Sequence, residues 1–252
     1  MTAAAVRSTT AVIPSPRQAL DDVAAPPSAA VATTVPAVAY QRVLHQLVRR
    51  ELRLLADIAA WAPVDDAERI AELARHAELI GRVVLHHHAT ERDAIWPVLR
   101  RTAAAAELGP ALGDWTSRCA RIDHMLRDVN TAGRQWTVAR AEHARDAFAV
   151  ACLVVADAVD AQTAEEERTL LPLIAAHLPA EDWAAIAASS RCDLTARDQL
   201  LVLGLALEDA CAGDRARVLE GLPRSVRLVW RHGGERRYRA TVVRLRGEPP
   251  AR

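Results

Sequence analysis

Two eleven-residue stretches decide the fold: HHATERDAIWP at residues 87–97 and QTAEEERTLLP at residues 162–172. Only three aligned positions are identical, yet each stretch begins with a polar residue, has a glutamate four residues later and ends in proline. Hydrophobic residues lie between the glutamate and the proline. The shared layout predicts two related helices that end or kink at Pro97 and Pro172, because proline lacks the amide hydrogen that a helix interior requires.

The polar residues of both stretches fall within hydrophobic helix faces when the sequence is placed on a wheel of about 100° per residue. His87 and Glu91 lie in the face of one helix, and Gln162 and Glu166 lie in the face of the other. The apolar members of the two faces are Leu73, Ile80, Val84, Ile95 and Val98, and Phe148, Cys152, Val155, Val159, Leu170 and Leu173. A buried carboxylate is costly unless it is paired, hydrogen-bonded or metal-bound. Since the chain contains no lysine and neither face has a central arginine, a shared metal ion is the simplest counter-ion for the two glutamates.

Single histidines on two other predicted helices can complete a metal site. His45 lies at the edge of the apolar face of the first helix. His124 lies on the third helix, but its apolar neighbours point to the opposite side, so it is either part of a mixed core-facing surface or a surface residue. Asp128, one turn later, is better explained as a solvated carboxylate. The weaker candidates are the flanking His86 and His88, His76 as a hydrogen-bonded core residue, and His143, His177 and His232 at surface or loop positions.

The chain as a whole predicts an all-α fold, an antiparallel four-helix bundle with a C-terminal helical extension. Half of the 252 residues are hydrophobic, and alanine and leucine, which favour helices, dominate. Residues 1–36 hold five prolines and four charges without a periodic pattern, which predicts disorder. We assign residues 37–190 to the bundle and residues 191–252 to the extension with its basic tail.

Helix boundaries are predicted from caps, glycines and prolines. Helices are expected over about residues 37–61, 65–96, 114–130, 138–171 and 194–210, with a short helix beginning near Ala180. Asp65 and Glu68 resemble a capping box at the start of the second helix. Two glycines and a proline within residues 109–113 predict a loop, and Gly133 predicts the end of the third helix.

Charge, cysteine usage and motifs limit the function classes. The net charge of zero argues against nucleic acid as the main partner, because phosphate binding requires a basic surplus. The four cysteines are widely spaced without a CxxC pair, which indicates reduced thiols of a cytoplasmic protein. The longest apolar run, AFAVACLVVA at residues 147–156, is too short to span a bilayer, and no signal peptide is recognisable. No phosphate-binding glycine loop, HExxH or GxSxG motif is present, and no general acid or nucleophile constellation supports an enzyme.

The C-terminal tail is strongly basic. From Arg224 to Arg252 there are nine arginines and two glutamates, a net charge of +7 (9 − 2). The favoured interpretation is a solvated basic face on a helical cap, because a Gly-Gly pair interrupts the segment and no long amphipathic stretch is present. The alternative is a surface for a membrane or an acidic partner. The sequence identifies no protein partner.

Together these residues resemble the hemerythrin HHE family. The resemblance rests on the lone His45, LHHHATERDAIWPVL at residues 85–99, the lone His124 and AEEERTLLPLI at residues 164–174, and it covers about residues 40–190. The sequence that follows is similar to the C-terminal extension of longer bacterial members. The resemblance implies a four-helix bundle that holds non-haem iron in a di-iron centre and binds O2, NO or peroxide rather than turning over an organic substrate. It implies that the ligands are His45, His87, Glu91, His124 and Glu166, with the two carboxylates bridging the irons.

Gln162 departs from the family, which expects histidine at this position. An amide oxygen is a neutral, weak donor for iron, so a di-iron site, a mononuclear site and a metal-free site all stay open. Gln162 is kept among the candidate metal residues, and it can instead hydrogen-bond a bound ligand. Arg92 also replaces the acid that often follows the first glutamate. The functional alternatives are an iron protein that binds or senses O2, NO or peroxide, a degenerate metal-free bundle that acts as a structural or protein-interaction module, and an oxidative enzyme.

Overall fold

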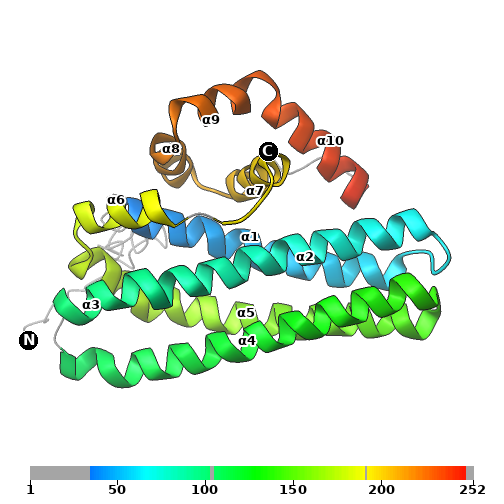
Figure 1. Cartoon of the computed structure of the whole chain (residues 1–252), viewed down its shortest axis with the longest axis horizontal. Coiled ribbons are helices and arrows are strands. Elements are labelled where there is room, and N and C mark those ends of the chain that lie inside the picture. Colours follow the sequence, from blue (N-terminus) through cyan, green and yellow to red (C-terminus); the bar gives the residue numbers. More distant parts are fainter. Residues whose placement is uncertain (1–34, 103–104, 191, 248–252) are drawn as a thin grey trace, which may run out of the picture.

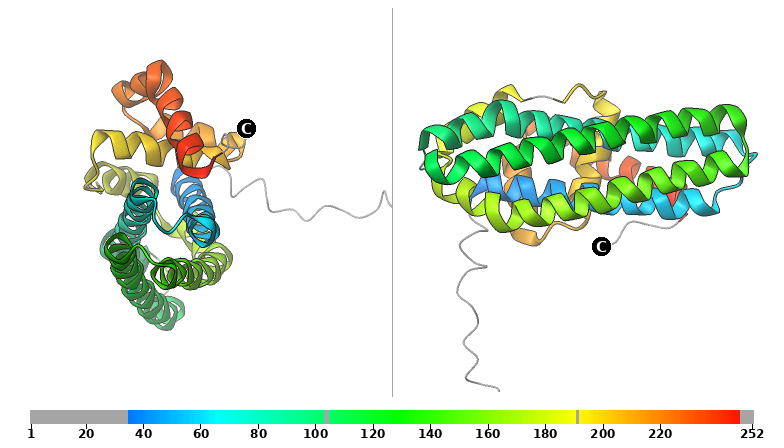
Figure 2. Two further views of the ribbon diagram at one scale, coloured as in Figure 1. Left: turned by 90° about the vertical axis from the view of Figure 1, so that its right-hand side faces the viewer. Right: turned by 90° about the horizontal axis from the view of Figure 1, so that it is seen from below.

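The computed structural model describes residues 35–102, 105–190 and 192–247, and all regular elements in these ranges are helical. Four long helical arms form an antiparallel bundle, and the last helices form a smaller layer against one side of it (Figures 1 and 2). The arms are α1 (Pro36–Trp61), α2 (Ala67–Thr90) continued by the π-helical segment η1 (Glu91–Ile95) and α3 (Trp96–Thr102), α4 (Ala105–Ala139), and α5 (Glu142–His177). The predicted all-α bundle with additional C-terminal helices is confirmed. The prediction of disorder for residues 1–36 lies outside the described residues, except at positions 35 and 36.

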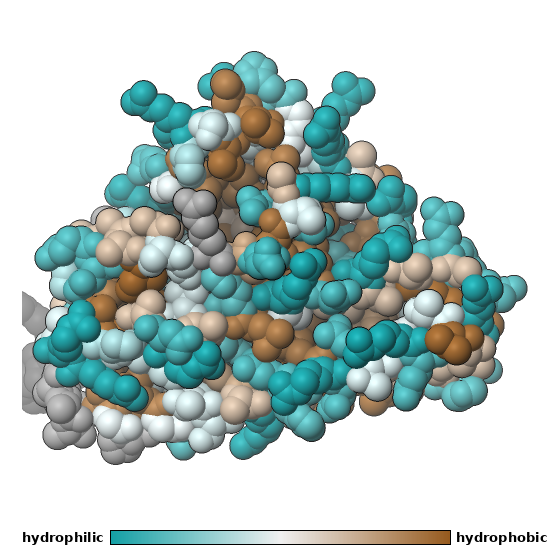
Figure 3. All heavy atoms as spheres, in the orientation of Figure 1, coloured by the Kyte–Doolittle hydropathy of each residue, from teal (hydrophilic) through white to brown (hydrophobic). Residues whose placement is uncertain are grey.

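The C-terminal extension contains more helices than the sequence pattern predicts. After α6 (Ala180–Ser189), which ends the part assigned to the bundle, its elements are α7 (Ala196–Glu208), α8 (Ala212–Gly221), α9 (Arg224–Val229), the π-helical segment η2 (Trp230–Gly234) and α10 (Glu235–Arg246). The basic tail is therefore helical over most of its length. Exposed hydrophobic residues appear over α9, with hydrophilic residues on both sides of them (Figure 3).

Buried ion pairs attach the extension to the first bundle helix. Glu51 of α1 is fully buried, and its carboxylate accepts hydrogen bonds from Arg50 Nε (2.8 Å) and Arg246 Nη2 and contacts His76 Nε2 (2.8 Å). Burial alone would raise the pKa of Glu51, but the His76 contact and the two guanidinium groups lower it to about 2. Arg246, at the end of α10, also pairs with Glu208 of α7 (2.7 Å). One carboxylate of the bundle thus holds the last helix of the chain.

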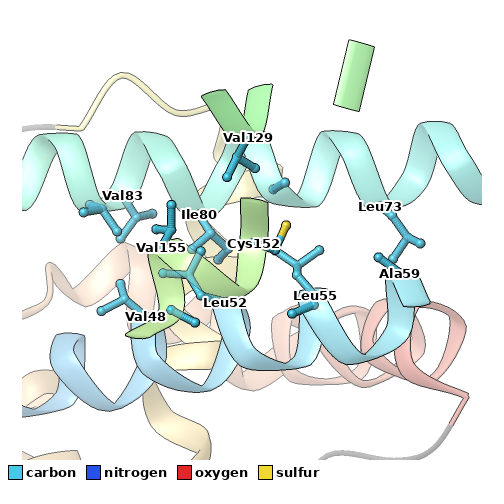
Figure 4. Close-up of a cluster of buried hydrophobic side chains, with 14 of the residues drawn as sticks. Val48, Leu52, Leu55, Ala59, Leu73, Ile80, Val83, Val129, Cys152 and Val155 are labelled. Atoms are coloured by element: carbon cyan, nitrogen blue, oxygen red, sulfur yellow. The ribbon is translucent and has the colours of Figure 1, made fainter. Parts of the chain in front are cut away.

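Two separate hydrophobic clusters fill the bundle. The larger cluster occupies the part nearest the α1–α2 and α4–α5 turns and continues into the extension, and Figure 4 shows its centre around Leu52, Ile80 and Val155. The smaller cluster, around Trp96, Leu99 and Leu170, lies at the other end of the bundle. Six buried polar residues lie where the two clusters meet: Gln41, His45, His87, Glu91, Gln162 and Glu166. The core is therefore interrupted by one polar layer.

The second arm differs from the prediction at both ends. Asp66, not Asp65, caps α2, because its side chain accepts a hydrogen bond from the Arg69 amide (3.0 Å). Pro97 does not end the arm. The Trp96 amide donates to the Glu91 carbonyl five residues earlier, which gives one wide π turn before α3. This wider turn lets the chain pass the proline and continue as a helix.

The third and fourth arms are also longer than predicted. Residues 109–113 are helical within α4, and Gly133 lies inside it. Burial of Leu112 and Trp115 stabilises the first of these segments, and Gly133 allows α5 to approach closely, because a Cβ there would lie 3.3 Å from a Phe148 ring carbon. α5 continues past Pro172 to His177, with Ile174 buried in the smaller cluster. Tertiary burial overrides the local helix-breaking signals.

α5 is the one described helix that is long and apolar enough to cross a bilayer by length and composition. It packs in the bundle against α1 and α4, and it carries buried Gln162 and Glu166. The helix is therefore explained as a core helix, and no membrane span is indicated.

Candidate metal centre

The polar layer brings together four residues that can hold a metal ion. α1 contributes His45, α2 contributes His87, η1 begins with Glu91, and α5 contributes Glu166. One ligand atom from each residue lies within 4.8 Å of the other three, and all four residues are buried. His87 and Glu91 are one helical turn apart, so both side chains leave the arm on the same side. Three arms of the bundle thus converge on one point.

Within this cluster each imidazole lies close to one carboxylate. His45 Nε2 lies 3.3 Å from Glu166 Oε2, and His87 Nε2 lies 3.5 Å from Glu91 Oε1. The two imidazole rings are arranged edge to face with centroids 5.3 Å apart. No arginine is paired with Glu91 or Glu166 among the residues that the structure describes. Imidazole groups are therefore the only basic side chains that contact the two carboxylates within the described part of the chain.

Four buried atoms in the cluster make no hydrogen bond of good geometry: His45 Nε2, His87 Nε2, Glu91 Oε2 and Glu166 Oε2, although the first and last of them are 3.3 Å apart. A buried polar atom without a partner is costly and rare in folded proteins. Each of these atoms can coordinate a cation, and each belongs to one of the four converging residues. Two imidazole nitrogens and two carboxylate oxygens form a donor set that suits a divalent transition metal. The residues present therefore fit one bound cation.

Burial controls the protonation of Glu91 and His87 in the metal-free protein. Burial and the neighbouring Glu166 carboxylate raise the pKa of Glu91 well above its ordinary value. Burial, together with the other nearby histidines, lowers the pKa of His87 well below its ordinary value. His87 is consequently neutral, which is the state in which imidazole binds metals. A cation in the layer would reverse the effect on Glu91 by stabilising its ionised form.

Glu167 orients His45. Its Oε1 atom lies 3.2 Å from His45 Nδ1 and 3.0 Å from Arg49 Nη1. Although burial opposes ionisation, these two contacts lower the pKa of Glu167, so its carboxylate is an acceptor. His45 Nδ1 therefore donates the proton, and Nε2 is the nitrogen that faces Glu166. A carboxylate behind a histidine is the arrangement that fixes the ring of a metal-binding imidazole.

Gln162 lies beside the cluster and is hydrogen-bonded within the protein. Its Nε2 atom donates to Glu166 Oε1 (2.6 Å) and to Cys119 Sγ (3.1 Å), and its Oε1 atom has no partner. Gln41 makes the corresponding contact on the other side, where Nε2 donates to Glu91 Oε1 (3.4 Å). Glu91 and Glu166 thus each accept one amide hydrogen bond through Oε1, and the Oε2 atom of each makes no hydrogen bond of good geometry.

The structure does not bring His124 to the cluster. Its side chain is 68% exposed and lies 4.0 Å from Asp128, which is itself exposed. The register of α4 explains this position, because Ile122 and Leu126 face the core while position 124 faces outward. The residue of α4 that contacts the layer is Cys119, through Gln162.

The other histidines and Arg92 lie outside the four-residue cluster. His76 is a buried, hydrogen-bonded core residue, as expected. His88 is buried and its Nδ1 atom lies 2.6 Å from Asp123 Oδ1, which fixes the ring adjacent to His87. His86 is half-buried near Ser190. Exposed or half-exposed positions are occupied by His143, His177 and His232, and Arg92 pairs with Asp93.

Sequence reasoning did not find three of the residues around the centre. Gln41 lies one turn before His45, so its place on the same helix face was a usable signal. Glu167 and Cys119 gave no such signal, since both are recognisable only from the packing of α1 and α4 against α5.

A helical bundle with a buried cluster of imidazoles and carboxylates defines a class of cation-binding bundle proteins. The sequence matches the hemerythrin HHE cation-binding domain over residues 37–174, which is more than half of the chain. The chain belongs to this family, and the predicted family membership is confirmed. No curated protein and no solved structure gave a significant match to the chain.

Proposed function

We propose that the protein binds a single iron ion through His45, His87, Glu91 and Glu166, and that this centre binds or senses O2, NO or peroxide. The observation that carries the proposal is the convergence of four buried ligand residues, each with an atom that makes no hydrogen bond of good geometry, within one layer. Imidazole with carboxylate and open positions is the donor set of non-haem iron sites that react with O2. A bound iron would supply reversible ligand binding and one-electron chemistry.

The side chains around the centre support one cation and not two. A second iron would require a ligand at position 162, where the family expects histidine. Here Gln162 donates its amide hydrogens to Glu166 and Cys119. His124, the expected ligand on the third helix, is exposed. The residues present thus supply ligands for one cation and leave a second position without imidazole.

The protein contributes orientation and exclusion of water. Glu167 holds the ring of His45, and Gln41 and Gln162 hold one oxygen of each glutamate. Hydrophobic clusters cover the layer on both sides. A small neutral ligand such as O2 or NO enters such a site more readily than a charged organic substrate, because the apolar surroundings disfavour charge. This argues for ligand binding rather than turnover, and the reduced cysteines favour a cytoplasmic location.

One observation favours a metal-free bundle as the second candidate function. A protonated Glu91, a neutral His87 and a His45–Glu166 ion pair would leave the layer without net charge. Burial opposes a charged His45, but its contacts with Glu166 and Glu167 raise its pKa overall. The bundle could then fold without a cation and act as a structural or protein-interaction module.

Elemental analysis after anaerobic reconstitution with ferrous iron and desalting distinguishes these functions. If the protein binds a single iron ion, we expect about one iron per chain. The iron should be lost in Glu91→Ala and in Glu166→Ala. The matched control is His124→Ala, which removes an exposed histidine and should retain the iron. Addition of NO to the reconstituted protein should then give a new absorption band. Two irons per chain would refute the single site, and no iron in a folded chain would favour the interaction module.

A further inference from the structure

The corner formed by α9, η2 and the first residues of α10, residues 224–239, carries an excess of positive charge. We call it the C-terminal corner. The corner contains six arginines and one glutamate, and two further arginines follow by residue 247, whereas the whole chain has 32 basic and 32 acidic residues. Figures 1 and 2 place α9 on the side of the extension that faces away from the bundle. The charge is therefore concentrated on one outer edge of the molecule.

Most of these arginines have no partner within the described part of the chain. Arg244 and Arg246 are used internally, in pairs with Glu72 and with Glu51 and Glu208. Arg239 pairs with the local glutamate, Glu235, at 3.1 Å. The remaining arginines, which make no ion pair with any described residue, are Arg224, Arg227, Arg231, Arg236 and Arg237. A solvated face needs no counter-charge, but such a density of like charge favours an anionic partner.

The C-terminal corner is held in shape by its apolar inner side. Trp230 and Tyr238 are buried, with ring centroids 6.0 Å apart. Gly234 allows the indole to approach, since a Cβ there would lie 3.0 Å from a Trp230 ring carbon. The backbone leaves helical geometry at Gly233 and turns into α10. Side chains from the segments before and after this kink therefore line one outer hollow.

This hollow has a volume of about 320 Å³, and three arginines and one glutamate are among its lining residues. Its lining residues are Arg231, His232, Gly233, Glu235, Arg236 and Arg239. Glu235 is already engaged by Arg239, which leaves Arg231 and Arg236 to face an incoming ligand. Guanidinium groups bind phosphate oxygens through paired hydrogen bonds, so a phosphate group fits this lining.

Exposed aliphatic side chains next to the hollow indicate the source of the phosphate. Leu228 and Val229, at the end of α9, are 56% and 51% exposed. Figure 3 shows hydrophobic residues at this outer edge, flanked by hydrophilic ones. A soluble phosphate compound gains nothing from these aliphatic residues, whereas a lipid surface offers phosphate and an apolar layer together. We propose that the C-terminal corner docks on an anionic membrane surface, with a lipid headgroup phosphate in the hollow.

The test is sedimentation of the full chain with phospholipid vesicles. We expect binding to vesicles of phosphatidylcholine mixed with phosphatidylglycerol, weakening with added salt, and no binding to phosphatidylcholine alone. Arg231→Ala with Arg236→Ala should weaken binding roughly 25-fold, since each arginine near an anionic surface contributes about a factor of five. The matched control is Arg121→Ala with Arg134→Ala, which removes the same charge from the exposed face of α4 and should leave binding within about two-fold.

The outcomes separate the possible partners. Loss of binding in Leu228→Ser with Val229→Ser would support the lipid surface over a purely electrostatic contact. Equal weakening in the α4 control would overturn the assignment of the site to this corner. Inorganic pyrophosphate that binds the protein when anionic vesicles do not would overturn the lipid partner in favour of a soluble phosphate. Tight binding of single-stranded DNA with no vesicle binding would overturn it in favour of nucleic acid.

Discussion

Replacement of Glu51 by glutamine removes one buried charge that Arg50, Arg246 and His76 contact. The substitution keeps the size of the side chain, but Arg246 then keeps Glu208 as its main anionic partner, and His76 loses its carboxylate. Folding lowers the pKa of Glu51 from 4.5 to about 2. A difference of this size corresponds to about 3 kcal/mol of folding free energy, within the range of about 3–5 kcal/mol for breaking a buried ion pair. We expect Glu51→Gln to lower the free energy of unfolding at pH 7 by about 3 kcal/mol.

The assay is urea unfolding followed by circular dichroism, repeated between pH 7 and pH 3. Because the folded pKa of Glu51 is depressed, its contribution is complete above its unfolded pKa of 4.5 and is lost as the pH falls toward about 2. The difference between the wild type and Glu51→Gln should be constant from pH 7 to pH 5 and fall to roughly half at pH 3. Glu220→Gln, at an exposed ion pair on α8, is the control and should change stability by less than about 1 kcal/mol. A Glu51→Gln effect below about 1 kcal/mol, or one that is independent of pH, would refute the reasoning.

Two further predictions concern packing and thiol accessibility. Gly204→Ala should destabilise the extension by about 3 kcal/mol in the same urea assay, because the new Cβ would lie 2.2 Å from a Tyr238 ring carbon. Gly213→Ala is the control, since no atom lies within 4 Å of a Cβ there, and a destabilisation equal to that of Gly204→Ala would contradict the packing argument. Exposed Cys211 should react with a disulfide reagent more than about 100-fold faster than Cys152, whose burial raises the thiol pKa to about 12. Comparable labelling rates in the native protein, followed by mass spectrometry, would show that the core around Cys152 opens readily.

The number of helical arms and their core-facing residues could be predicted because both follow from hydrophobic periodicity. His87, Glu91 and Glu166 stand within long apolar faces, and that position alone places them in the interior. Helix ends could not be predicted in the same way. Pro97, Pro172 and the glycines of α4 are strong local breakers, but the free energy of burying neighbouring side chains exceeds the local penalty.

The sequence indicated the four residues that converge in the cluster, together with His124, which does not, and it gave no geometry. The sequence shows that His45 lies near a core face, but it does not show that Glu167 holds the ring from behind. His124 illustrates the opposite case. Its poor phase on the helical wheel was a valid signal, and the structure leaves it exposed. Hydrogen bonds between arms, such as that of Gln162 with Cys119, depend on the axial register of two helices, which no pattern within one helix specifies.

The single π turn at η1 has a consequence for how this arm tolerates changes in length. A π turn closes its hydrogen bond over one residue more than an α turn, so η1 contains, in effect, a one-residue insertion directly after Glu91. The helix faces before and after the π turn both point toward the bundle core, so that Glu91 and Trp96 are both buried. Deletion of one residue among positions 92–94 could be absorbed by conversion to a regular α turn, whereas a deletion within α2 would rotate His87 out of the layer by about 100°. The segment is therefore the point at which this arm can change its residue count while preserving the angular position of its ligands.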